Sequence, residues 1–175
     1  MKEELEKIVS SGCIGRAQID KVVDYVLNDP DLFPILYALT QHENPRTTHH
    51  AWWACEKLSR KMPDFFIDRK AELQKLVLSA SQEGVRRIVL NILYNLPYKG
   101  DTDVVFLNYC LDEMLSPHRA PAVQALLLKH AFVQCSKEPE LLQEFFVLLE
   151  YADLDNYSPA VTSTVRNLLK KRKKH

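Results

Sequence analysis

Residues 84–93 read G-V-R-R-I-V-L-N-I-L, and their apolar side chains recur with the period of an α-helix. Four of these side chains, at positions i, i+3, i+4 and i+7, share one helical face: Val85, Ile88, Val89 and Ile92. Three other segments align with this face without gaps, and the four aligned faces begin 34, 34 and 42 residues apart. Their residues are Ala51, Ala54, Cys55 and Leu58; Arg119, Ala122, Val123 and Leu126; and Val161, Thr164, Val165 and Leu168. The chain is therefore expected to repeat one structural unit.

Proline-containing breaks separate the periodic segments and divide the chain into pairs of helices. First helices are predicted to begin near Asp31, Asp64, Asp103 and Glu138, and second helices near Thr48, Glu83, Pro117 and Pro159. The Ser116-Pro117 and Ser158-Pro159 pairs are typical helix starts, with serine as the cap and proline in the first turn. This gives four units of about 35 residues, each with two helices. A further pair, at 3–10 and 16–28, precedes them.

The segment 84–93 resembles the V-R-x-A-A-x-x-A-L pattern of the second helix of a HEAT repeat, an armadillo-type helical repeat. A-W-W-A-C-E-K-L at 51–58 and V-T-S-T-V-R-N-L-L at 161–169 are looser matches. The resemblance covers about 30–175 and is closest to short bacterial HEAT-like proteins. It implies an all-α fold, an α-solenoid (superhelix) forming a single domain over 1–175. The expected parts are an N-terminal cap at 1–29, four helix-pair repeats at 30–169 and a basic tail at 170–175.

The composition is that of an ordinary globular protein, with 46% hydrophobic and 26% charged residues. No apolar run approaches the ~18 residues of a membrane span, and the acidic start M-K-E-E-L-E-K contains no apolar signal core, so a cytoplasmic protein is expected. The net charge of zero includes five basic residues at 170–174. Without them the chain has 18 basic and 23 acidic residues and is therefore acidic. The basic tail is expected to stabilise a helix C-terminus, where cations oppose the helix dipole.

The segment 48–58, T-H-H-A-W-W-A-C-E-K-L, contains both tryptophans of the chain. On a helical wheel, Ala51, Cys55 and Leu58 face the core and Trp52 lies on the flank. The opposite face carries His49, Trp53, Glu56 and Arg60. HEAT-like proteins act as scaffolds that bind partners on the concave side, which second helices line. The resemblance therefore implies that this face binds a protein or peptide. The repeat alignment extends it to Arg87, Tyr94, Gln124 and Arg166.

A nucleic-acid role is the alternative, because Trp52 and Glu56 are four residues apart. This spacing is similar to the tryptophan–acid arrangement of HEAT-type alkylpurine DNA glycosylases, and Lys57 and Lys61 would add charge. However, the acid is Glu rather than Asp, and the chain without its tail is acidic, whereas nucleic-acid binding requires a basic surface. The composition therefore does not favour nucleic acid as the partner.

The sequence contains none of the common catalytic or metal-binding motifs. It has no H-E-x-x-H, no close-spaced cysteine pair, no G-x-S-x-G and no phosphate-binding loop. The four cysteines, Cys13, Cys55, Cys110 and Cys135, are expected to be free thiols. We therefore expect no enzyme activity and no cofactor, and a chain that is a monomer or a weak dimer.

Overall fold

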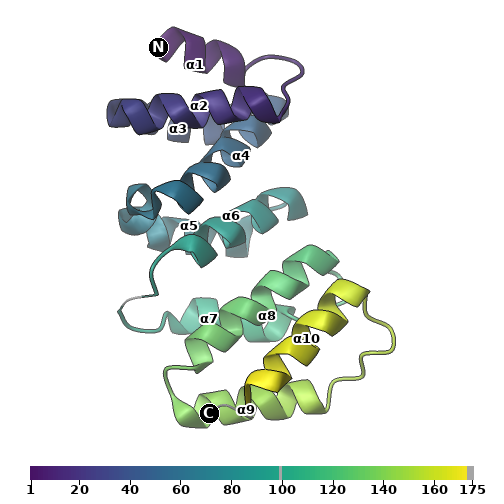
Figure 1. Ribbon diagram of the computed structural model, residues 1–175. Coiled ribbons are helices and arrows are strands. Elements are labelled where there is room, and N and C mark those ends of the chain that lie inside the picture. Colours follow the sequence, from purple (N-terminus) through teal and green to yellow (C-terminus); the bar gives the residue numbers. More distant parts are fainter. Residues whose placement is uncertain (99, 173–175) are drawn as a thin grey trace. The chain divides into compact units, whose positions relative to one another are not determined.

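The computed structural model describes residues 1–98 and 100–172. This part of the chain is helical and contains no β-strand (Figure 1). Its α-helices are α1 (Lys2–Val9), α2 (Arg16–Asn28), α3 (Phe33–Ala38), α4 (Pro45–Lys61), α5 (Lys70–Ser79), α6 (Glu83–Asn95), α7 (Val104–Glu113), α8 (Pro121–Cys135), α9 (Pro139–Glu150) and α10 (Pro159–Arg172). Three 3-10 helices accompany them: η1 (Pro30–Leu32), η2 (Leu39–Gln41) and η3 (Pro63–Arg69). The N-terminal pair is at the predicted place.

The chain divides into two compact units. The first unit contains Met1–Leu76 and Asn91–Pro97, and the second contains Val77–Leu90 and Tyr98–His175. The helices α5 and α6 each contribute residues to both units. A single domain over 1–175 stays a prediction, and each unit is described by itself.

In the first unit, α2 packs against both α1 and α4, and α3 packs against α4. An aromatic cluster joins α3 to η3: Phe33 stacks on Phe65 with ring centroids 4.8 Å apart, and Phe66 meets Phe33 edge-on. The largest fully buried side chains of this unit are Leu5, Ile19, Leu36, Leu58, Phe66, Leu73 and Ile92. Leu58 and Ile92 lie on apolar faces that the sequence periodicity predicts.

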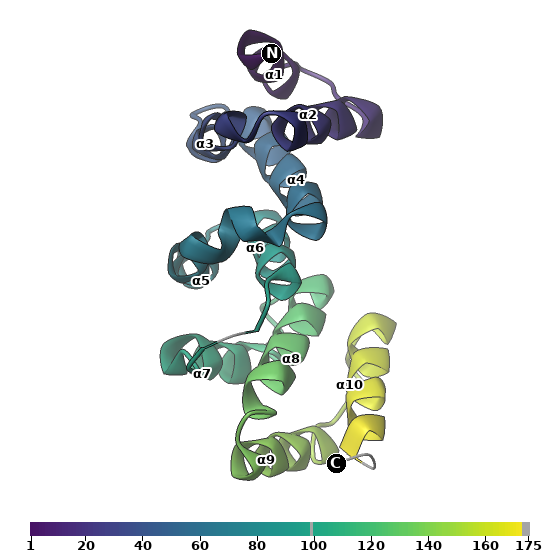
Figure 2. The same ribbon diagram turned by 60° about the vertical axis from the view of Figure 1, so that its left-hand side comes forward.

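In the second unit, α8 is the central helix and packs against α7, α9 and α10. The helices α8 and α10 lie side by side in both views (Figures 1 and 2). Tyr157, just before α10, donates a hydrogen bond to the Leu115 carbonyl, 2.6 Å away. The second unit buries Ile88, Leu90, Leu127, Leu128 and Phe145.

Proline fixes the first turn of four helices. Pro45, Pro121, Pro139 and Pro159 are the first residues of α4, α8, α9 and α10. A proline at this position costs nothing, because the N–H that it lacks would have no partner within the helix. Asn44 caps α4 by accepting the Arg46 N–H at 2.9 Å. The second helix predicted near Thr48 therefore begins earlier, at Pro45.

The predicted start of the third second-helix is wrong, because α8 begins at Pro121 rather than Pro117. Residues 116–120 form turns, and Ala120 has the extended backbone of an N-cap residue. Arg119 therefore precedes the helix instead of lying on its buried face, and Ala122 is exposed. The buried residues of α8 include Val123, Leu127 and Ala131.

The other first helices and the C-terminal tail need smaller adjustments. The helices predicted near Asp31 and Asp64 begin as the 3-10 turns η1 and η3. Residues 170–172 form the last turn of α10, which places three basic side chains at its C-terminal end. Residues 173–175 of the predicted tail lie outside the described part of the chain.

Candidate binding surface on helix α4

Helix α4 buries one face and exposes the other. Ala51, Cys55 and Leu58 have no exposed surface, and burial raises the pKa of the Cys55 thiol. A buried thiol with a raised pKa is a poor nucleophile and a poor metal ligand. Trp52 is 3% exposed and meets the Tyr37 ring of α3 edge-on, with centroids 6.0 Å apart. Trp52 therefore closes the contact between α3 and α4, as expected from its position on the flank.

Trp53 lies on the other side of α4 and is only half-buried. The Lys57 ammonium is 5.9 Å from the centroid of the Trp53 ring, a cation–π contact one helical turn away. Lys57 also forms an ion pair with Asp20 of α2, and its hydrogen bond is the main cause of the lowered pKa of that carboxyl. These two contacts hold Lys57 between Trp53 and α2.

Glu56 and Arg60 form an ion pair across one turn of α4, with Nη2 to Oε1 at 2.8 Å. The Arg60 side chain is 62% exposed, whereas the Glu56 side chain is 9% exposed. The wheel predicts Glu56 on the open face, but its place at the edge of that face allows neighbouring side chains to cover it. Glu56 therefore orients Arg60 and presents little surface itself.

Two further predicted residues of this surface are exposed in the first unit. His49 is exposed near the start of α4, and Tyr94 is 44% exposed in the last turn of α6. Asn95 donates a hydrogen bond of 3.0 Å to the Ser59 hydroxyl. Since Asn95 follows Tyr94 and Ser59 precedes Arg60, this bond places the end of α6 against the end of α4.

The remaining predicted contact residues lie in the second unit. Arg166 is exposed and Arg87 is half-buried. Gln124 is 4% exposed and donates a hydrogen bond of 2.8 Å to the Ser116 carbonyl. The predicted exposure of Gln124 is therefore wrong. The cause is the later start of α8, which places Gln124 in its first turn, against the preceding loop.

The residues of the alternative nucleic-acid face are buried or form ion pairs within the first unit. Trp52 is buried, so it could stack on a base only after α3 and α4 separate. Lys61 lies 3.3 Å from a carboxylate oxygen of Asp24, just as Lys57 pairs with Asp20. Two of the predicted phosphate-binding cations thus already bind carboxylates of α2. Asp20 and Asp24 were not predicted as the partners of these lysines. Both pairs are 37 residues apart, close to the length of one repeat, and this spacing could have suggested them.

His50 has a packing role in α4. His50 Nδ1 is 3.0 Å from the Val9 carbonyl oxygen and ties α4 to α1. Within residues 1–98 and 100–172, no group of three His, Cys, Asp or Glu side chains could hold a metal ion.

Comparison with known proteins assigns the fold to a family. The sequence matches the HEAT repeat domain over residues 5–172. The chain belongs to the HEAT repeat family. The predicted all-α, HEAT-like solenoid class is confirmed, and the match includes most of the 1–29 segment, which the resemblance does not cover. Searches of the curated proteins and of the solved structures found no match. No helix of this HEAT chain, within the residues described, has the length and hydropathy to span a bilayer.

Proposed function

We propose that this HEAT chain is a non-catalytic, cytoplasmic scaffold that binds a protein or peptide through a surface on its first unit. The surface consists of His49, Trp53 and Arg60 of α4 and Tyr94 of α6. The observation that carries the proposal is the partly exposed Trp53 ring on the same helix face as the exposed Arg60 guanidinium. Tryptophan, tyrosine and arginine are the residues most enriched in the energetic centres of protein interfaces.

The chemistry of this surface supports a protein partner rather than a polyanion. Arg60, and Lys57 beside the surface, have acidic neighbours, since Glu56 pairs with Arg60 and Asp20 pairs with Lys57. A mixed surface of this kind attracts DNA poorly, because non-specific DNA affinity depends on unpaired cations. A peptide that places an apolar side chain on Trp53 and an acceptor on Arg60 would use both groups at once.

The test is affinity capture from a lysate on immobilised wild-type chain and on matched variants. Trp53→Ala and Arg60→Ala are expected to lose a specific captured protein by about 10-fold or more, the effect of an interface centre. Ile67→Ala is the control, because Ile67 is also in the first unit and is 43% exposed. Circular dichroism confirms that each variant is folded. Capture that survives Trp53→Ala unchanged would contradict the proposal.

Duplex DNA serves as the competing ligand in the same series. We expect no salt-dependent mobility shift at physiological ionic strength. A shift that weakens when Lys57 and Lys61 are replaced by glutamine would replace the scaffold proposal with nucleic-acid binding.

A further inference from the structure

Helix α9 presents apolar side chains to solvent on the face opposite its core contacts. It buries Leu142, Phe145, Phe146 and Leu149. On the other face, Val147 is 39% exposed and Leu148 is 52% exposed. Tyr151, directly after the helix, is 87% exposed. Repeat proteins usually keep such outer faces polar for solubility, and a cluster of exposed apolar side chains marks an interaction surface.

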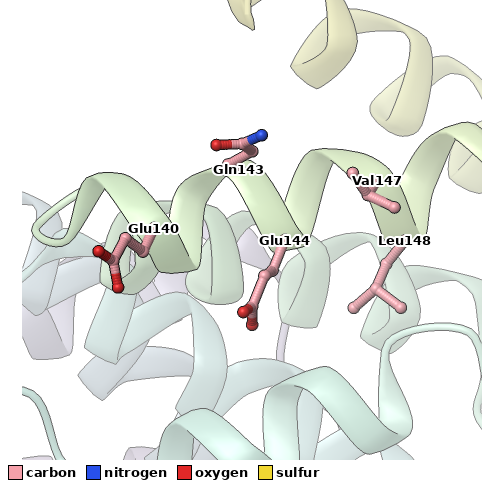
Figure 3. A pocket seen from close by; sticks show the side chains of 5 residues that line it. All are labelled: Glu140, Gln143, Glu144, Val147 and Leu148. Atoms are coloured by element: carbon pink, nitrogen blue, oxygen red, sulfur yellow. The ribbon is translucent and has the colours of Figure 1, made fainter.

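The exposed face of α9 contains a shallow groove of about 590 Å³. Its lining residues are Glu140, Gln143, Glu144, Val147 and Leu148 (Figure 3). They form two rows at a spacing of four residues, one of Glu140, Glu144 and Leu148 and the other of Gln143 and Val147. Rows at this spacing are the ridges between which a second helix inserts its own side chains. The groove is polar and acidic toward the start of α9 and apolar toward its end.

The charge on this groove identifies the kind of occupant. Glu140 and Glu144 are exposed and make no ion pair with any residue in the described ranges, 1–98 and 100–172. Glu150, at the end of the same helix, instead pairs with Arg172 of α10. Two carboxylates of like charge at i and i+4 repel each other. A cation between them would relieve this repulsion, whereas an anionic lipid surface or a nucleic acid would increase it.

We propose that the α9 groove binds a cationic amphipathic helix of a partner protein. The lysine or arginine side chains of that helix would lie against Glu140 and Glu144, and its apolar side chains would lie against Val147 and Leu148. This surface belongs to the second unit, and the α4 surface belongs to the first. The inference therefore does not depend on the proposed function.

The test uses the full chain and a defined probe, measured by fluorescence anisotropy. The probe is a labelled 18-residue helical peptide with leucine on one face and lysine on the other. A second peptide has glutamate in place of every lysine. The wild-type chain is expected to bind the lysine peptide at least about 10-fold more tightly than the glutamate peptide, because complementary charge determines the partner. Equal binding of the two peptides would overturn the inference.

Two variants remove the two halves of the groove. The double variant Glu140→Gln, Glu144→Gln and the single variant Leu148→Ser are each expected to weaken binding of the lysine peptide by about 5-fold or more. The controls are Asp112→Asn, an exposed carboxylate, and Val104→Ser, an exposed apolar side chain, both on α7. Trp53→Ala is expected to bind like wild type.

The variants distinguish the groove from general attraction to an acidic protein. If the controls weaken binding as much as the groove variants, or if the glutamine variant binds like wild type, the α9 groove is not the site. The glutamate-to-glutamine changes preserve side-chain shape, so they test the groove even if Leu148→Ser destabilises the chain.

Discussion

His130 is a buried, neutral histidine within α8. It is 1% exposed, and its Nε2 lies 2.9 Å from the Leu90 carbonyl oxygen. Because a carbonyl only accepts, Nε2 carries the proton. The Phe106 ring meets the imidazole edge-on. Burial lowers the pKa of His130 to about 4, against a smaller opposite effect of the hydrogen bond to Leu90. The histidine thus acts as a core residue that holds α8 against α6.

This burial predicts that the second unit loses stability in mild acid. The pKa of His130 is lower in the folded chain than in the unfolded chain. As the pH falls from about 6.5 toward 4, the unfolded chain therefore binds the proton more readily, which favours unfolding. Between pH 7 and pH 5 the loss from His130 is expected to be about 2 kcal/mol. Urea denaturation at each pH measures it. His130→Gln is expected to remove this dependence, and His118→Gln, at an exposed site, is expected to keep it. An equal acid dependence in His130→Gln and wild type would contradict the assignment.

The two adjacent tryptophans show how far a helical wheel predicts single residues. The period of α4 separates Trp52 from Trp53 by about 100°, which was enough to place Trp52 on the flank and Trp53 on the face away from the core, but left open whether a neighbouring element covers Trp53. The wheel could not predict that Glu56 is covered, because coverage depends on the side chains of other helices. It also could not predict that Lys57 turns toward Asp20, a residue of α2 that only the three-dimensional packing brings close.

At the scale of elements, Glu83 connects the start of α6 to the start of α8. Its carboxylate accepts the Ala120 N–H at 3.0 Å and pairs with Arg119 at 3.1 Å and with Arg86. Arg86 is 4% exposed and also donates to the Val77 carbonyl at 2.9 Å. Burial alone would raise the pKa of Glu83. The hydrogen bond from the Ala120 N–H and the charges of Arg86 and Arg119 together lower it by more, so the pKa is lowered overall. The ionised form of Glu83 is therefore the one that the fold stabilises.

Replacing this carboxylate by an amide is expected to weaken the second unit. Glu83→Gln keeps the shape and the acceptor for Ala120, but it leaves the buried Arg86 guanidinium without its counter-charge. The expected cost is about 1–2 kcal/mol of unfolding free energy, measured by urea denaturation at neutral pH. The control Asp112→Asn removes an exposed carboxylate and is expected to cost less than about 0.5 kcal/mol. A cost for Glu83→Gln no larger than that of the control would show that the network adds nothing to stability.

The same network explains which helix boundary the sequence could not predict. Most helix starts were predicted to within a few residues, because proline and capping residues act locally. The Ser116-Pro117 pair has the same local signal as Ser158-Pro159, yet only the second starts a helix. The difference is Arg119, which forms ion pairs with Glu113 at 2.6 Å and with Glu83, and so holds 116–120 as a turn. Ion pairs between separate elements are not a local signal of the kind that proline and capping residues give.

At the scale of the whole molecule, the repeat pattern predicted the class of fold but not its division. The helix pairs bury apolar faces against neighbouring pairs, and this regularity is visible as a sequence period. The division into two compact units passes through α5 and α6, whose periodicity is continuous. The candidate surfaces were predicted unevenly for the same reason. Periodicity predicts the outward face of α4. It does not predict the exposed apolar face of α9, because the exposure of Val147 and Leu148 depends on whether another helix packs against them.

Repeat architecture also predicts how damage to one core spreads. Helices of a repeat protein contact mainly their neighbours, so stability is close to a sum of local terms. Leu58 is fully buried in the first unit and Leu127 in the second. Each leucine-to-alanine change is expected to cost about 2–5 kcal/mol through lost contacts and a cavity. Hydrogen exchange followed by mass spectrometry is expected to show the largest loss of protection in α2–α4 for Leu58→Ala, and in α8–α10 for Leu127→Ala. A uniform loss along the whole chain in both variants would instead indicate that the two units unfold as one.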